Sequence, residues 1–157
     1  DKITVQNEGR DSDTWRDDEN ELFIEPSNAG TEPYVQFCIN AEGEIFDQVR
    51  GREGTAWDAK SLECVTKVYD DYWVLELSFL LEDLKDLDVK GIPVGETWGW
   101  NFTRHIMSGV DLWTTWSDTG VSFHTPSAFG DIIFTEEELA VSPKEKVSIT
   151  WGKIKCY

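Results

Sequence analysis

A tryptophan and a glutamate near the start of the chain have side chains and a spacing suited to holding a sugar ring. Trp15 lies in an acidic loop six residues before Glu21, which directly precedes the apolar run 22–24. An indole stacks on the apolar face of a pyranose, and a carboxylate at the start of a strand accepts hydrogen bonds from hydroxyls. The pair predicts that the Trp15 ring is exposed as a stacking surface and that the Glu21 side chain points inward, toward the ligand. The alternatives are a tryptophan packed under its own loop and a solvated edge carboxylate.

Three later segments follow this loop in a recognisable order. They are Tyr-Val-Gln-Phe-Cys-Ile-Asn (34–40), Trp-Gly-Trp-Asn-Phe-Thr-Arg (98–104) and the aromatic loop and strand 123–134. Together with the Trp15 loop, they resemble the signature of family 9 carbohydrate-binding modules over residues 11–134. The resemblance implies non-catalytic binding of a neutral polysaccharide or oligosaccharide. It also implies an extracellular glycan-degrading system that includes a glycoside hydrolase, either linked or separate.

The resemblance supplies the other expected members of the site. Phe123 stands where the family has a second sandwiching tryptophan, so Trp15 and Phe123 are expected to face each other across an aromatic slot. Arg104 is expected at the floor of the slot as a planar donor beside Glu21, or else in a structural ion pair. His124 is a further candidate donor to a sugar hydroxyl, although a single histidine in a loop is more often structural.

Other positions qualify this assignment. The family commonly has an arginine where this chain has Cys38 and a glutamine where it has Thr103, and both substitutions reduce the polar contacts available to a ligand. Trp57 follows a polar, glycine-containing loop and is predicted to be an additional stacking surface. Four tryptophans on strand-like segments are instead predicted to pack in the core or on a sheet face; they are Trp98, Trp100, Trp113 and Trp116.

The periodicity predicts an all-β fold, an antiparallel β-sandwich. Apolar residues alternate with polar ones over 35–40 and 73–79, and turn residues separate many short segments. Residues 81–87 repeat leucine at helical spacing and are expected to form a short helical connection. We expect one sandwich domain over residues 1–135 and an extension over residues 136–157. Only residues 1–14 precede Trp15, so part of the family's N-terminal strands is expected to be missing, leaving an unpaired edge. The strand-like stretch 147–154, another chain or an upstream segment would cover that edge.

Composition narrows the functional classes. The chain has 157 residues, 39% of them hydrophobic, and a net charge of −17. This charge repels phosphate backbones and anionic lipid, so nucleic-acid and membrane-surface roles are disfavoured. No apolar run is long enough to cross a bilayer. The chain starts without Met or a signal peptide and is read as a processed or excised piece. The expected location is extracellular, at the cell surface or periplasmic.

Metal and catalytic alternatives stay open at this stage. Acidic clusters at residues 11–13 and 17–19 could hold calcium, and the resemblance favours a structural calcium, but they do not fit the EF-hand pattern. The three cysteines show no zinc-type spacing. The rival function is a glycoside hydrolase or polysaccharide lyase with paired carboxylates. A haem site built from Met107, His105 and His124 is a weaker third reading.

Overall fold

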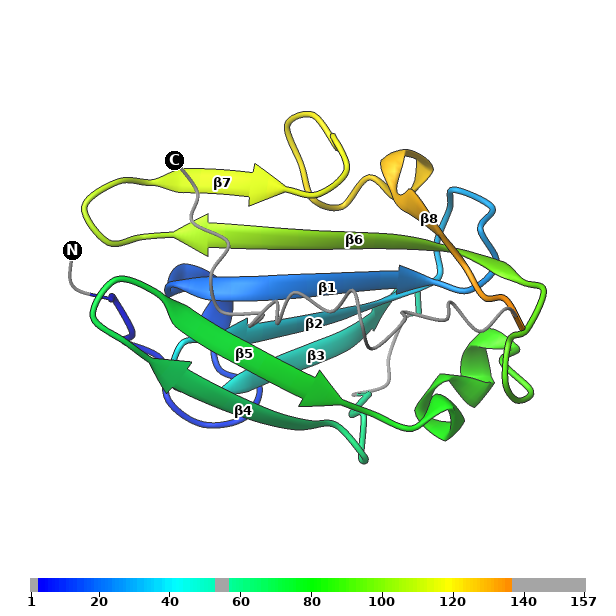
Figure 1. Ribbon diagram of the computed structural model, residues 1–157, viewed down its shortest axis with the longest axis horizontal. Helices are drawn as coiled ribbons and strands as arrows, with labels where there is room; N and C mark the ends of the chain where they lie inside the picture. Colours follow the sequence, from blue (N-terminus) through cyan, green and yellow to red (C-terminus); the bar gives the residue numbers. More distant parts are fainter. Residues whose placement is uncertain (1–2, 53–56, 137–157) are drawn as a thin grey trace, which may run out of the picture.

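The protein forms two antiparallel sheets that pack face to face (Figure 1). The computed structural model describes residues 3–52 and 57–136. The larger sheet has the strand order β3-β2-β1-β6-β7, and β8 also pairs with β6; the smaller sheet contains β4 and β5. The strands are β1 (Glu19–Glu25), β2 (Tyr34–Asn40), β3 (Ile45–Arg50), β4 (Glu63–Val68), β5 (Trp73–Ser78), β6 (Thr97–Ile106), β7 (Leu112–Thr115) and β8 (Gly130–Ile133). The predicted antiparallel sandwich is confirmed.

The core lies between the two sheets and follows the predicted alternation. Leu22 and Ile24 on β1, with Val35, Phe37 and Ile39 on β2, point toward the smaller sheet and are at most 4% exposed. Leu75 and Leu77 of β5 pack against this cluster from the other side. The connection Leu81–Leu87 is helical as predicted, in the tighter 3₁₀ form, and it buries Leu84.

The opposite face of the larger sheet is polar, yet much of it is also buried. The segment before β1 folds over one end of this face, held by two buried carboxylates. Asp17 accepts hydrogen bonds from Gln6 N and Asn40 Nδ2, while Asp18 accepts from the backbone N–H groups of Thr4 (2.6 Å) and Met107 (3.0 Å). All seven residues of β2 are therefore buried, because both of its faces are covered.

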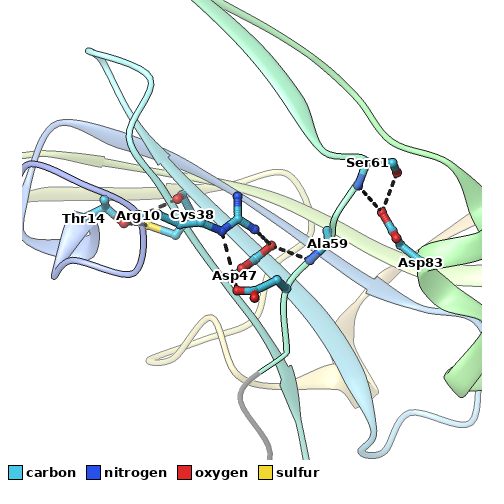
Figure 2. A network of polar contacts seen from close by, with 8 residues as sticks. Arg10, Thr14, Cys38, Asp47, Ala59, Ser61 and Asp83 are labelled. Atoms are coloured by element: carbon cyan, nitrogen blue, oxygen red, sulfur yellow. Dashed lines mark hydrogen bonds and ion pairs between the residues drawn. The ribbon is translucent and has the colours of Figure 1, made fainter.

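Asp17 and Asp18, two of the acidic residues for which calcium was expected, are thus engaged by the protein itself. A second acidic group, Asp11, Asp47 and Asp58, brings carboxylate oxygens within 4.8 Å of one another. Arg10 already neutralises much of that charge, since its guanidinium lies 2.6 Å from Asp47 and 3.6 Å from Asp58. Figure 2 shows Asp47 between Arg10 and the backbone N–H of Ala59, which ties the segment after β3 to the sheet.

The first strand after Trp15 is not an edge strand. β1 is central and pairs with β2 on one side and β6 on the other. The smaller sheet has two strands among the described residues and does not cover the whole core-facing side of the larger sheet. Phe102 of β6 and Leu112 of β7 lie on that side, yet they are 46% and 47% exposed. The predicted strand 147–154 and the rest of the extension from residue 137 lie outside the described residues. Within those residues, no helix is both long and apolar enough to cross a membrane.

Candidate binding site

A pocket of about 550 Å³ opens on the polar face of the larger sheet, on the side away from β4 and β5. Strands β1, β2 and β3 supply its floor, while β7, the turn η1 (Thr14–Arg16) and the loop before η3 (Pro126–Ala128) supply its walls. The lining residues are Trp15, Glu21, Gln36, Phe46, Gln48, Arg50, Trp113, Gly120, Val121, Ser122, Phe123 and His124. The volume is typical of small-ligand sites.

Aromatic rings form the walls of this pocket. Trp15 packs edge-to-face on Phe46 of β3, with ring centroids 4.8 Å apart. Trp113 of β7 lies flat against the ring of His105, its cross-strand partner, at 3.5 Å and 16°. Phe123 meets Trp113 edge-on at 5.1 Å. Trp113 nevertheless stays 49% exposed. The fixed, half-open rings are suited to stacking on a flat apolar ligand surface.

A row of polar side chains crosses the floor. Gln48 of β3 donates a hydrogen bond to Gln36 of β2, and Gln36 in turn donates to Glu21 of β1. Because each amide group is oriented by its neighbour, the remaining donors and acceptors of the row have fixed directions. Arg50 lies at the end of β3 and is half-exposed, with its Nε 3.7 Å from Glu32 Oε1. The pocket therefore offers acceptors and donors beside its aromatic walls.

Burial raises the pKa values of three acidic groups at and beneath the pocket floor. It raises the pKa of Glu21 to about 7, against the opposing effect of the hydrogen bond from Gln36. Glu19, two residues earlier on the same face of β1, is fully buried, and burial together with the nearby Glu21 raises its pKa well above the usual value. The Cys38 thiol beside them is raised in pKa for the same reasons. These three groups are therefore less acidic than their exposed counterparts.

His124 has a defined structural partner as well as a place in the lining. Its Nδ1 lies 2.7 Å from the Tyr34 hydroxyl, and its ring packs perpendicular to Phe23 at 5.5 Å. Burial lowers its pKa, and the nearby Arg50 lowers it further. The imidazole is therefore harder to protonate than an exposed histidine, and Tyr34 and Phe23 orient it at the pocket wall.

The structure brings four of the six predicted site residues together and separates the other two. Trp15, Glu21, Phe123 and His124 all line the pocket. Arg104 does not: it pairs with Asn20 across the β1–β6 ladder, so the alternation of side chains puts it on the face opposite Glu21. The expected pairing of Arg104 with Glu21 in the slot is corrected.

Trp57 also lies away from the pocket. Its ring stacks on Phe37 at 6.2 Å and 23°, on the core side of the sheet. The polar loop before it suggested exposure, but the indole covers the core next to Phe37. The expectation of an additional stacking surface at Trp57 is therefore corrected.

Several lining residues were missed from the sequence. Trp113 was predicted to pack in the core or on a sheet face; it does lie on the sheet face, against His105, but it is 49% exposed and also lines the pocket. Trp116, for which the same was predicted, is 53% exposed and packs against Phe102 outside the pocket. Trp98, in contrast, is buried at 1% as predicted. Gln36 and Gln48 were not singled out, although period-two alternation places both on the face of β2 and β3 that carries the pocket. The alternation of 34–40 could have indicated Gln36 once Glu21 was assigned inward.

Three solved structures share this arrangement of sheets. One is a proposed carbohydrate-binding protein from Bacteroides uniformis, with a TM-score of 0.64 at 19% identity, covering 84% of this chain and 67% of that one. The chain has the fold of a family 9 carbohydrate-binding module. Two such modules from Caldicellulosiruptor kristjanssonii superpose with TM-scores of 0.59 (glucose complex, 19% identity) and 0.58 (cellotriose complex, 20% identity). They cover 83% and 87% of this chain, which spans 65% and 68% of theirs.

The likeness is visible in structure and not in sequence comparison. No family model matches the sequence, and no curated protein does either. Identities near 20% describe a shared fold, so the ligand of this chain has to be argued from its own pocket.

Proposed function

We propose that this protein is a non-catalytic module that binds a neutral oligosaccharide or polysaccharide in the pocket between Trp15, Trp113 and Phe123. The observation that supports this most directly is the combination of half-open aromatic walls with an oriented row of amides and a carboxylate on the floor. A sugar ring has apolar faces and a hydroxyl-bearing edge, so it matches both surfaces at once.

In this mode, the indoles receive the faces of the ring and the floor receives its edge. Glu21 and Gln36 would accept and donate hydrogen bonds to hydroxyls, while Arg50 would bind at the more exposed end. Each hydrogen bond to a neutral group contributes about 1 kcal/mol net, because the same groups give up water when the sugar binds. Affinity would therefore depend on the stacked rings as much as on the polar contacts.

The arrangement of carboxylates favours binding over hydrolysis. A glycosidase needs two carboxyl groups flanking the scissile bond. Among the described residues that line the pocket, Glu21 is the one carboxylate; Glu19 is nearby but 0% exposed beneath the lining. A carboxyl group in that position has no access to a substrate from the opposite side. We therefore rank the hydrolase or lyase alternative below the binding module.

A module of this kind would act outside the cytoplasm beside a glycoside hydrolase, linked or separate. The fold shared with sugar-binding modules supports this context. The net charge of −17 does not oppose binding to a neutral polymer, whereas it repels the phosphate groups of a nucleic acid.

The function is tested by titrating the purified chain with glucose, cellotriose and other neutral oligosaccharides in a calorimeter, after a glycan array has identified the best class. We expect saturable binding at one site and no release of reducing ends from xylan, cellulose or pectin digests. Steady product release that disappears in Glu21→Gln would show an enzyme instead. Absence of binding to every sugar on the array would overturn the proposal.

A further inference from the structure

Three buried side chains that can bind a metal ion converge at the pocket floor and directly beneath it. Glu19 and Glu21 of β1 and Cys38 of β2 each place one ligating atom within 4.8 Å of the other two. All three residues are at most 4% exposed. The register explains the convergence, because Glu21 and Cys38 are directly opposite across the β1–β2 ladder and Glu19 precedes Glu21 by one full period on the same face.

The polar atoms around this cluster are incompletely satisfied. The Glu19 carboxylate accepts a hydrogen bond from the Cys38 thiol at 3.6 Å on Oε2, and the backbone N–H of His105 also acts on it, but Oε1 is buried without a well-aligned hydrogen bond within the described residues. Thr103 is 4% exposed and stands directly opposite Glu21 on β6, so its side chain lies on the same face as the cluster. Its hydroxyl Oγ1 is also buried without a partner in that part of the chain. Buried polar atoms without partners cost free energy, and an ion with its bound water would recover part of that cost.

We propose that Glu19, Glu21 and Cys38 form a binding site for a thiophilic divalent cation of the zinc class. One thiolate and two carboxylates are ligands that zinc accepts, whereas calcium and magnesium do not take sulfur. A tetrahedral zinc holds its ligand atoms about 3.5 Å apart, and the three candidate ligand atoms here lie within 4.8 Å of one another. Three protein ligands leave a fourth position, near which Thr103 Oγ1 would hydrogen-bond a bound water.

Charge and access are consistent with such an ion. Glu19 and Glu21 are neighbouring carboxylates on the same face of β1 and repel each other, and a divalent cation between them would offset that repulsion. Arg104 attracts Glu19 through space but lies on the opposite side of the sheet. Glu21 also lines the pocket, so an ion can enter from it. On the other side, Thr14 covers Cys38, as Figure 2 shows, with its Oγ1 3.2 Å from the sulfur.

The test is a titration of the reduced, metal-free protein with Zn²⁺ against a chromophoric chelator, and with Co²⁺ followed by absorption. We expect one ion per chain and a thiolate-to-cobalt charge-transfer band. Cys38→Ser and Glu19→Gln should each weaken Zn²⁺ binding at least tenfold, while Cys64→Ser, which changes the partly buried cysteine of β4, should leave it unchanged. Equal binding in Cys38→Ser, or no binding by the wild type, would overturn the site.

A second variant keeps Cys38 and removes the other cysteines, so the test does not depend on whether Cys38→Ser folds. Cys64→Ser combined with Cys156→Ser leaves Cys38 as the one cysteine of the sequence. A cobalt band retained in this variant assigns the thiolate to Cys38, and loss of the band would refute the assignment. The assays contain no sugar, so their outcome is independent of whether the pocket binds carbohydrate.

Discussion

Substitution of Trp113 is the most direct test of whether the pocket binds a sugar. The sequence predicted only a packing role for this residue, whereas the structure places its ring in the pocket wall. It is 49% exposed, and for a side chain of up to about 250 Å² this leaves roughly 120 Å² open. A sugar ring lying on it would cover about half of that area, which contributes about 1.5 kcal/mol at about 25 cal/mol per Å². Stacking adds about 0.5–1 kcal/mol. Trp113→Ala should therefore cost about 2 kcal/mol of binding free energy, which weakens the affinity about 30-fold.

Trp116 offers a matched control three residues away. It is 53% exposed, but its ring packs near Gly130 and against Phe102 on the other face of the sheet. Isothermal titration with the best sugar from the array should show the loss in Trp113→Ala, little change in Trp116→Ala, and partial recovery in Trp113→Phe, which keeps a ring. Circular dichroism must first show that each variant is folded, since Trp113 also stacks on His105.

The outcome that would refute the reasoning is specific. If Trp113→Ala binds as tightly as the wild type, the half-open indole is not a ligand surface and the pocket is wrongly assigned. If Trp116→Ala loses as much affinity as Trp113→Ala, the effect comes from the stability of β7 and not from stacking.

Three further predictions concern stability. Burial lowers the pKa of His124, so the unfolded chain takes up the proton first. The stabilisation of wild type over His124→Gln should be full above about pH 6.5 and shrink as the pH falls below that value; chemical denaturation at several pH values would measure it, and a constant difference would contradict it. Asp18→Ala leaves the partly buried N–H groups of Thr4 and Met107 without their acceptor and should cost about 1–3 kcal/mol of unfolding free energy, whereas Asp70→Ala at an exposed position should cost little. Deleting residues 140–157 should lower the melting temperature or cause aggregation, because the larger sheet exposes apolar side chains such as Phe102; an unchanged melting temperature and a monomeric state would show that the tail is an appendage.

The sequence by itself determined the class of fold and much of the pocket. Period-two alternation in 34–40 assigned Phe37 to the core, and the order of the motifs brought Trp15, Glu21, Phe123 and His124 into one site. The assignment of the core succeeds because side-chain direction along a strand is a local property: once one residue of a strand points inward, the rest follow. The grouping of the site residues came from the resemblance to family 9 modules and not from alternation.

Tertiary structure decided what depends on pairing between strands and on coverage of their faces. Arg104 moved to the other side of the sheet because its register with Asn20, and not its place in a motif, sets its direction. Trp57 became part of the core and Trp113 a wall of the pocket, because burial depends on which elements cover a residue, and single-sequence patterns do not contain that information. The buried group of Glu19, Glu21 and Cys38 arises in the same way, from two strands whose pairing places their side chains together.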